Sequence, residues 1–372
     1  MAQTVNQRLA DEAVRHRLFL ARYSTKQAND MIAALRKSRI AVTVNLVEQL
    51  ERRGMTPQNF TVQRLNLVKR ELERQMTAVY EQVFGQLGDD LRKLVVQETD
   101  YQFKALDTIL PTVVTDAIPL TAITPAQVFA AANAKPFQGV LLKDWAKTMA
   151  SDFVRAAGSQ IQQGYLLGET NEQIVRRVIG TAANKYADGT LGQSARGLAA
   201  VTKSAVSHFA AEARDEMGRQ NEDLIKSRIW LSTLDTHTTK MCIIRDRMRY
   251  TFDTPPKPIG HSVPYGAGPG RLHFCCRSTE TWEIKSWREM GIDVDEMPDG
   301  VRSALGGDVP SGMSYTEWAK RQPYHVLEAV FGVTRARGIR DGSIQPAKLF
   351  SDNGEYLTLD QLRKLDSEAL AR

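Results

Sequence analysis

Residues 65–87, LNLVKRELERQMTAVYEQVFGQL, carry the pattern that decides the fold of the first part of the chain. Apolar residues recur there at steps of three and four, which places them on one face of an α-helix. The steps from Leu65 to Met76 and from Met76 to Leu87 are both eleven residues, which favours a nearly straight helix over a left-handed coiled coil. We therefore predict a long helix with a buried stripe made of Leu65, Val68, Leu72, Met76, Val79, Val83 and Leu87.

The neighbouring residues extend this helical reading in both directions. The apolar positions from Ile32 to Leu50 predict another amphipathic helix, which Gly54 closes. We expect residues 1–107 to form a helical N-terminal region that serves as a bundle and carries no chemistry. Residues 108–140 are expected to be a linker or an irregular connection, because they contain four prolines at 111, 119, 125 and 136.

Helices are expected to resume after the linker. Thr170 and Gln173 have the spacing of a capping box and predict a helix start immediately before Ile174. A later helix carries His208 on an apolar stripe that includes Leu198 and Val201. A histidine in such a position is expected to be a satisfied core residue rather than a catalytic one.

The composition limits the class of protein. The chain has 372 residues, 42% of them hydrophobic and 25% charged, which is typical of a soluble protein with two or three domains. The polar residues 1–12 predict no secretory signal. The most apolar stretch, 109–134, is interrupted by three prolines and by Asp116, so no membrane span is expected. Three cysteines, two of them adjacent, favour a reducing cytoplasm over a disulfide framework.

The net charge of +6 is concentrated in a few segments. Residues 226–277 contain nine Lys or Arg and three Asp or Glu, so this segment alone carries a net charge of +6. A local basic surface is suited to nucleic acid or to an acidic protein. Solvated helix faces with unpaired arginines are the other reading. The residues predicted to bind nucleic acid or a partner are Arg245, Arg247, Arg249, Lys257, Arg271 and Arg277.

The same segment changes from helical to strand and loop patterns. Residues 229–231 and 249–252 read as short strands. Between them and the last cysteines, residues 254–270 contain five prolines and four glycines. A loop of this length in a compact unit is usually functional or tied down from outside.

This segment also contains all three cysteines and three of the six histidines. Cys242, His273 and Cys276 are candidate ligands of a zinc ion, since thiolate and imidazole suit tetrahedral zinc. A fourth ligand would come from His261, His237 or Asp235. The alternative is that Cys242 and Cys276 are small buried hydrophobic residues and that no metal binds.

The order of residues from Trp230 to Arg277 resembles the signature of the phage head-morphogenesis, or Mu F-like minor head protein, family. The resemblance rests on Trp230, Asp235, Thr238 and Cys242, then a strand, a Pro/Gly loop and the closing run His273-Phe-Cys-Cys-Arg277. The run Gly164-Tyr-Leu-Leu-Gly-Glu169 is similar to the usual lead-in of the family. Tyr315 to Gln322 and Leu357 to Leu362 are similar to a tail common in these proteins.

Three positions depart from the family pattern. His237 stands where the family usually has Arg, Phe274 where it has Pro, and Ser278 where many members have a final Cys. The last change removes one potential metal ligand and leaves the order of elements intact.

The resemblance implies a fold that is mainly α, with a small α+β part towards the C-terminus. The resemblance spans roughly residues 141–365 and implies a compact head-morphogenesis domain with short strands at 141–284 and a tail region at 285–372. The helical region 1–107 and the linker 108–140, which precede it, are expected from the residue pattern. The head-morphogenesis domain would contain the Cys/His cluster.

The implied function is that of a minor capsid protein without enzymatic activity, located in the phage head and, during assembly, in the host cytoplasm. Its expected partners are the portal protein, a scaffold or major capsid protein, and double-stranded DNA bound without sequence preference; no membrane is involved. One alternative is a metal-dependent nuclease or hydrolase using His237, Asp235 or His261, but the chain lacks paired carboxylates, H-E-x-x-H and a P-loop. Another is a host DNA-binding protein, which would need a recognisable DNA-binding motif.

Overall fold

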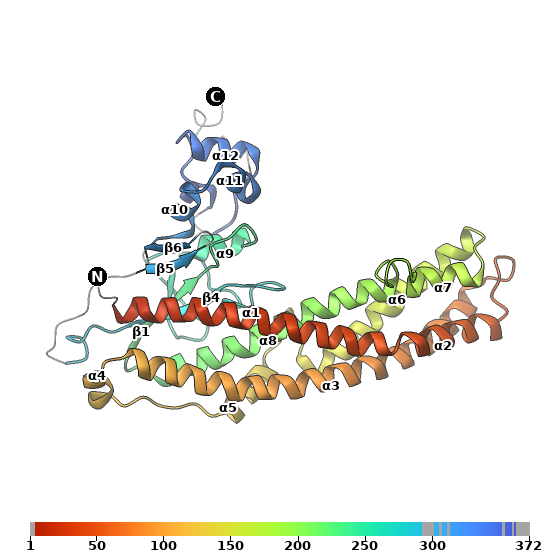
Figure 1. Cartoon of the computed structure of the whole chain (residues 1–372), viewed down its shortest axis with the longest axis horizontal. Helices are drawn as coiled ribbons and strands as arrows, with labels where there is room; N and C mark the ends of the chain where they lie inside the picture. The colour runs from red at the N-terminus through yellow and green to blue at the C-terminus, as the bar shows by residue number, and fades with distance from the viewer. Residues whose placement is uncertain are drawn as a thin grey trace. The chain divides into compact units, whose positions relative to one another are not determined.

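The computed structural model describes residues 4–291, 301–304, 307–310, 313–351, 354–358 and 361. Its architecture is mainly α with a small antiparallel sheet, as expected (Figure 1). The chain forms two compact units. We call residues 22–94 and 129–209 the helical unit, and residues 1–21, 95–128 and 210–372 the sheet unit. The contiguous domain bounds expected from the sequence stay a prediction.

Long helices supply most of the secondary structure. The N-terminal helices are α1 (Val5–Lys37), α2 (Arg39–Arg52) and α3 (Val62–Ile109), followed by α4 (Thr112–Ala117) and α5 (Pro125–Ala134). The next group is the 3-10 helix η1 (Leu142–Asp144), α6 (Trp145–Leu166), α7 (Asn171–Ile179) and α8 (Thr190–Gln220). Among the helices of the described residues, none has the length and apolar character needed to cross a membrane.

The predicted stripe on α3 is the core-facing side of that helix. Val68, Leu72, Met76 and Leu87 are fully buried and Leu65 and Val83 nearly so, whereas Val79 is only partly buried. Hydrophobic burial of such a stripe supplies most of the stability of a helix in water. The stripe therefore confirms the long helix and its orientation within the helical unit.

Two predictions for residues 1–140 were wrong about where helices begin and end. The expected helix over 32–50 is interrupted at Ser38, which separates α1 from α2 and whose hydroxyl donates to Leu35 O at 2.7 Å. Serine competes with helical hydrogen bonding in this way. The expected irregular connection 108–140 contains α4 and α5 because Pro111 and Pro125 lie at helix starts, where proline is favoured.

Local signals in the helical unit were read correctly. Thr170 and Gln173 form the predicted capping box at the start of α7. His208 is 2% exposed, and its Nε2 lies 2.9 Å from Ala132 O. It is thus a satisfied core histidine.

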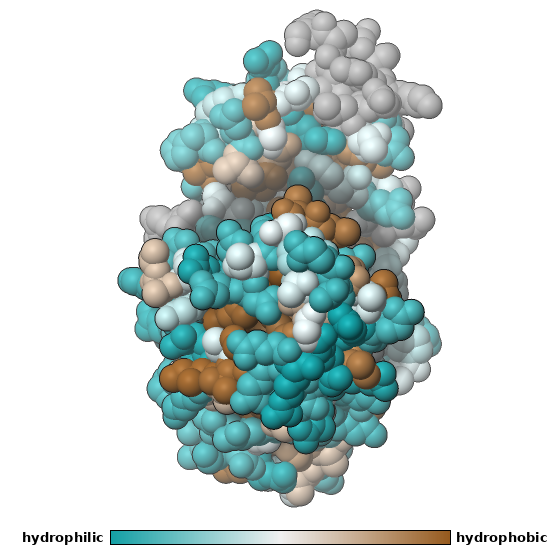
Figure 2. Space-filling view, turned by 90° about the vertical axis from the view of Figure 1, so that its right-hand side faces the viewer, coloured by the Kyte–Doolittle hydropathy of each residue, from teal (hydrophilic) through white to brown (hydrophobic). Residues whose placement is uncertain are grey.

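Apolar side chains on the surface occur in separate small groups among hydrophilic ones on the face shown in Figure 2.

The sheet unit contains a four-stranded antiparallel sheet in the order β3-β2-β1-β4. Its strands are β1 (Ile225–Leu231), β2 (Arg249–Tyr250), β3 (Pro258–Ile259) and β4 (Thr279–Ile284). The predicted strands at 229–231 and 249–252 correspond to β1 and β2, although β1 begins earlier. Strands β3 and β4 were not anticipated. A separate two-stranded sheet pairs β5 (Val301–Ala304) with β6 (Gly307–Pro310).

Helix α8 approaches this sheet closely at Gly218. A Cβ atom at that position would lie 2.5 Å from the Phe252 ring and 2.9 Å from Trp282 Nε1. Any larger residue would force the helix away from the sheet. Glycine is therefore required at this crossing, despite its cost in a helix interior.

The C-terminal helices belong to the same sheet unit. They are α10 (Tyr315–Lys320), α11 (Tyr324–Phe331), α12 (Val333–Arg340) and the 3-10 helix η2 (Pro346–Leu349). These helices share one apolar core with Leu234 and Ile243. In addition, the Asp246 carboxylate accepts from Tyr315 N at 2.9 Å. The expected final helix falls largely outside the described residues, as do Leu359, Asp360 and Leu362 of the family-like tail.

Candidate metal centre

Short elements of the sheet unit bring the three candidate ligands together. Cys242 lies on the one-and-a-half-turn helix α9 (Lys240–Arg245), which follows the end of β1. His273 and Cys276 lie on a turn closed by a hydrogen bond from Cys276 N to His273 O at 3.1 Å. Cys275 has a φ of 55°, and this left-handed conformation leaves its side chain exposed while Cys276 is buried. The two adjacent cysteines thus point in different directions.

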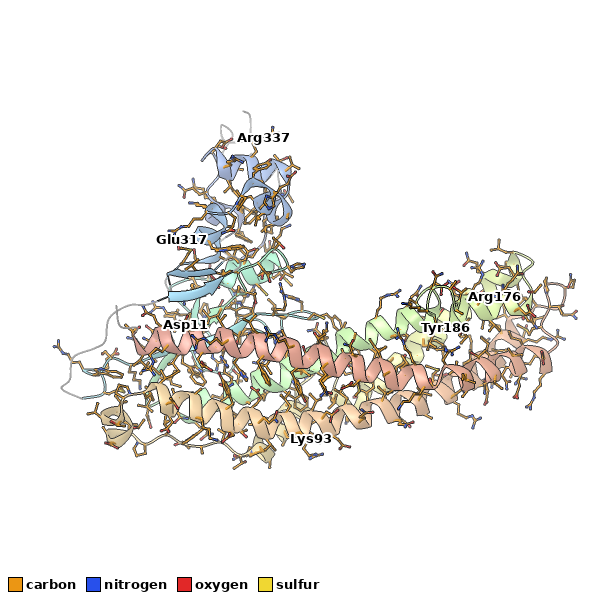
Figure 3. All side chains as sticks on the ribbon, viewed as in Figure 1. Asp11, Lys93, Arg176, Tyr186, Glu317 and Arg337 are labelled. Atoms are coloured by element: carbon orange, nitrogen blue, oxygen red, sulfur yellow. The ribbon has the colours of Figure 1, made fainter. Side chains whose placement is uncertain are left out.

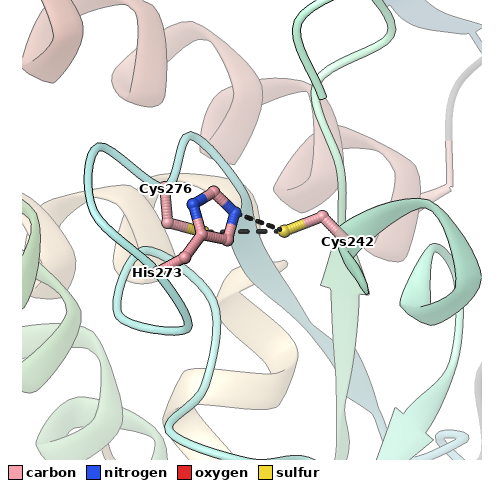
Figure 4. Close-up of side chains that lie close together, drawn as sticks. All are labelled: Cys242, His273 and Cys276. Atoms are coloured by element: carbon pink, nitrogen blue, oxygen red, sulfur yellow. Dashed lines mark hydrogen bonds between the residues drawn. The ribbon is translucent and has the colours of Figure 1, made fainter. Parts of the chain in front are cut away.

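The three ligand atoms lie close together, and two of their separations are near those of a tetrahedral zinc site (Figure 4). Cys242 Sγ lies 3.7 Å from Cys276 Sγ and 3.3 Å from His273 Nε2, and all three ligand atoms fall within 4.8 Å of one another. Ideal tetrahedral zinc with ordinary bond lengths separates two sulfurs by about 3.8 Å and a sulfur from a nitrogen by about 3.6 Å. The group could hold a metal ion without large rearrangement.

The surroundings of the three ligands polarise the two thiols differently. A hydrogen bond from the Cys242 thiol lowers the pKa of Cys276 well below its usual range. The same hydrogen bond, together with burial, raises the pKa of Cys242. The hydrogen bond to Cys276 also raises the pKa of His273. One thiolate is thus favoured before any metal arrives, and a metal would have to displace the proton on Cys242.

The candidates for a fourth ligand lie elsewhere. His261 Nε2 is 2.9 Å from Arg249 O, and its ring packs on Tyr250. His237 is exposed, and Asp235 pairs with Arg277 at 2.5 Å. Within the described ranges, no further His, Cys, Asp or Glu joins the three ligands.

Two hydroxyl groups are the closest polar neighbours of the cluster. Thr239 Oγ1 is 2.9 Å from His273 Nε2. The buried Ser278 hydroxyl lies near Cys242 and lowers the pKa of that thiol, but it makes no hydrogen bond of normal geometry with any described residue. The side chains that adjoin the cluster here are therefore hydroxyl groups, and the described residues offer no fourth thiolate, imidazole or carboxylate.

An apolar shell surrounds the sulfur atoms. Trp230, Tyr250 and Tyr265 form one buried cluster with Cys242 and Cys276. This environment explains why burial opposes ionisation of both thiols. It also limits water access, which is a property of structural metal sites more than of catalytic ones.

Arg17 is a residue of this centre that the sequence did not reveal. It comes from α1 and donates to the backbone carbonyls of Cys276 and Arg277 at 2.7 and 3.0 Å. Burial lowers the pKa of Arg17 to about 10, although attraction to Cys276 acts in the opposite direction. No periodicity or motif links residue 17 to residue 276, so only the folded chain could show the contact.

Two of the six basic residues expected to bind a partner are used inside the sheet unit. Arg245 is 8% exposed and donates to Met241 O and Pro264 O. The Arg271 side chain is 9% exposed and pairs with Glu212 at 2.9 Å and Asp215 at 2.5 Å. Both arginines hold the Pro/Gly loop in place. The loop is thus tied down, as the sequence suggested, but by arginines as well as by the Cys/His turn.

The other four basic residues lie nearer the surface. The Lys257 side chain is 71% exposed and pairs with Asp253 at 3.1 Å. The Arg249 side chain is 46% exposed and pairs with Glu283 at 3.2 Å, and that of Arg277 is 35% exposed. Arg247 is partly exposed with a φ of 67°. Nucleic-acid or partner binding by these residues stays a prediction.

Comparisons of this chain with protein-family models, with curated proteins and with solved structures found no match.

Proposed function

We propose that this chain is a minor head protein of a phage, which associates with the portal protein during procapsid assembly and acts through binding surfaces. The observation that carries the proposal is the convergence of the signature residues. Trp230 and Arg277 are 47 positions apart in the chain, yet the residues of this segment meet around one small cluster.

Each end of the signature contributes to this cluster. Asp235 pairs with Arg277 and accepts from Thr238 Oγ1 at 3.3 Å. Trp230 packs with Cys242 and Cys276 in the apolar shell. The contacts therefore support reading the motif as one structural unit.

We further propose that the metal of the centre is zinc and that its role is structural. Thiolate and imidazole ligands suit zinc, and the sulfur–sulfur and sulfur–nitrogen distances are close to tetrahedral values. Cys242 and Cys276 are 1% and 0% exposed. Such burial favours a role in holding the loop over hydrolysis of a large substrate, so we place a nuclease or hydrolase second.

The proposed contact surface is basic. Arg249, Lys257 and Arg277, with Arg247 beside them in sequence, would face an acidic portal surface, a scaffold or major capsid protein, or the packaged double-stranded DNA. Contacts between these side chains and phosphates would be independent of sequence and strongly weakened by salt. The proposed location is the interior of the phage head, and the host cytoplasm during assembly.

Co-expression with the cognate portal protein tests the proposal. We expect the two proteins to co-purify at moderate salt, and the double variant R249A/K257A to bind less portal protein than the wild type. Arg15→Ala is the matched control, because Arg15 is an exposed arginine outside the signature, with a side chain 72% exposed. Absence of any association at moderate salt would contradict the minor-head function.

A further inference from the structure

The turn that carries His273 and Cys276 is held by a residue from the opposite end of the chain. Arg17 donates from Nη2 to Cys276 O at 2.7 Å and from Nε to Arg277 O at 3.0 Å. The guanidinium group presents these donors in a rigid fork. Two consecutive carbonyl groups must therefore keep one spacing and one direction for both hydrogen bonds to form.

This contact is directed entirely at the ligand turn. Among the described residues, Arg17 forms no ion pair with a carboxylate, and its side-chain hydrogen bonds go to the carbonyl groups of Cys276 and Arg277. The residue is only 8% exposed. A buried guanidinium left without acceptors is costly. Movement of the ligand turn would consequently leave Arg17 unsatisfied and weaken the docking of α1.

The rest of the α1 contact near the turn is incompletely filled. Ala10, Ala13 and Val14 pack against Leu231. Towards the turn, however, a cavity of about 240 Å³ lies between Leu18 of α1 and residues 231–235. Arg17 borders this cavity and is the polar link across it. Arg17 is therefore the side chain of α1 that connects this helix directly to the backbone of the ligand turn.

We propose that metal binding at Cys242, His273 and Cys276 is coupled to the docking of residues 5–21 of α1, with Arg17 as the positioning residue that links them. The metal fixes the turn, the turn fixes the two carbonyl groups, and these hold Arg17. This inference rests on the proposed metal centre but not on the portal or capsid role. Coupling between two sites is reciprocal, so release of α1 lowers metal affinity by the same factor by which metal strengthens docking.

One consequence concerns partners of the N-terminal helix. A partner that pulls residues 5–21 away from the sheet unit would weaken metal binding. Conversely, loss of metal would make this end of α1 available. Metal occupancy of the centre would thus determine how tightly residues 5–21 of α1 are bound to the rest of the sheet unit.

The experiment uses the full chain loaded with Zn²⁺ and the same chain treated with a chelator. Hydrogen exchange of backbone amides in residues 9–20 is measured in both states, and Zn²⁺ affinity is measured by competition with a chromophoric chelator. In the wild type, we expect faster exchange in this segment after chelation. In Arg17→Ala, we expect Zn²⁺ affinity to fall on the order of tenfold, within the usual range of coupling between sites.

Two further variants test whether the effect depends on the paired donors of the Arg17 guanidinium group. Arg17→Lys keeps the charge but not the paired donors, so its Zn²⁺ affinity should lie between those of the wild type and Arg17→Ala. Arg15→Ala, two residues away on an exposed face, should bind Zn²⁺ as the wild type does. If Arg17 only attached α1 to the sheet unit, Arg17→Ala would speed the exchange of residues 9–20 equally with and without metal. Its Zn²⁺ affinity would then be unchanged.

Three results would overturn the proposal. The first is equal exchange of residues 9–20 in the wild type before and after chelation, which needs no variant and holds even if Arg17→Ala fails to fold. The second is wild-type Zn²⁺ affinity in Arg17→Ala. The third is absence of Zn²⁺ binding by the wild type, which removes the metal centre and the coupling together. Portal co-purification is measured separately and can succeed or fail independently of all three.

Discussion

Charged residues in the helical unit lie mostly on its surface, whereas several in the sheet unit are enclosed by protein. Lys93 pairs with Asp90 at 3.1 Å and Arg176 with Glu172 at 3.8 Å, and in both pairs the basic side chain is more than half exposed and points away from its helix (Figure 3). Arg228 and Asp215 in the sheet unit are 0% and 4% exposed and form an ion pair. The two units therefore depend on different interactions.

The buried network of the sheet unit is continuous. Asp215 binds both Arg228 and Arg271. Burial raises the pKa of Asp215, but the two arginines outweigh it and hold this pKa below its usual range. Arg228 also donates to Tyr265 OH at 3.1 Å, and Tyr265 donates to Glu280 at 2.6 Å.

This difference shows what each unit requires to stay folded. The helical unit has long amphipathic helices whose apolar stripes bury enough surface to be stable. The sheet unit has two strands of only two residues each and a long Pro/Gly loop. Short strands supply little packing. The Pro/Gly loop 254–270 must therefore be held by side-chain interactions of Arg245 and Arg271 and by the turn that carries His273 and Cys276.

The largest expected effect is loss of the buried acid that both arginines share. Asp215→Asn should lower the free energy of unfolding by about 3–5 kcal/mol, since it removes the buried acid that Arg228 and Arg271 share. Glu280→Gln is the matched variant, and it should cost far less. Burial raises the pKa of Glu280, and an amide oxygen can still accept from Tyr265. If urea unfolding showed the same loss of free energy for both variants, Asp215 would contribute no more to the network than Glu280.

Truncation of the apolar stripe tests the other side of the comparison. Leu72 is fully buried on α3. We expect Leu72→Ala to destabilise the helical unit by about 2–5 kcal/mol through lost burial and the cavity that remains. Thermal or urea unfolding followed by circular dichroism at 222 nm measures this. A loss below 1 kcal/mol would mean that the stripe is not what holds this unit.

Metal removal should affect only the sheet unit. We expect about one zinc per chain, lost in Cys242→Ser, with increased exchange in residues 254–276 and little change in the helical unit. Ser278→Cys should tighten binding by adding a thiolate close to Cys242. Affinity should fall as the pH falls, because the raised pKa of His273 lets protons compete for its nitrogen from a higher pH than usual. A metal-free protein of full stability would exclude zinc and leave the fold unchanged.

The smallest effect is expected for a surface ion pair. Arg74 and Glu71 lie one helical turn apart on α3, and the arginine side chain is 79% exposed. Solvent and salt screen such pairs. Arg74→Ala should therefore leave the melting temperature unchanged within error, and a clear decrease would place surface pairs among the interactions that hold the helical unit.

Expectations drawn from local pattern agreed well with the structure. The stripe on α3, the capping box at Thr170 and the buried His208 all depend on residues close in sequence. The grouping of Cys242, His273 and Cys276 was also recognised, since these residue types rarely cluster without a reason. Strand β4 was missed because it begins at Thr279, directly after the signature, and its central residues are buried on both faces without clear alternation.

Whether an individual arginine is exposed or buried could not be inferred from the sequence. Arg245 and Arg271 were expected at a binding surface along with Arg249 and Lys257, but the fold encloses the first two. A charged residue is equally compatible with solvent and with a buried partner, and its choice depends on acids far away in the chain, such as Glu212 for Arg271.

The amino-acid sequence by itself determined the helices and the ligand types of the candidate centre, because periodicity and chemistry act over short distances along the chain. Tertiary structure alone decided that Arg17 would contact the ligand turn from 259 residues away, that two arginines would bind the loop, and that Ser278 would lie next to Cys242. These outcomes depend on which distant segments fold against each other, and no local pattern records that.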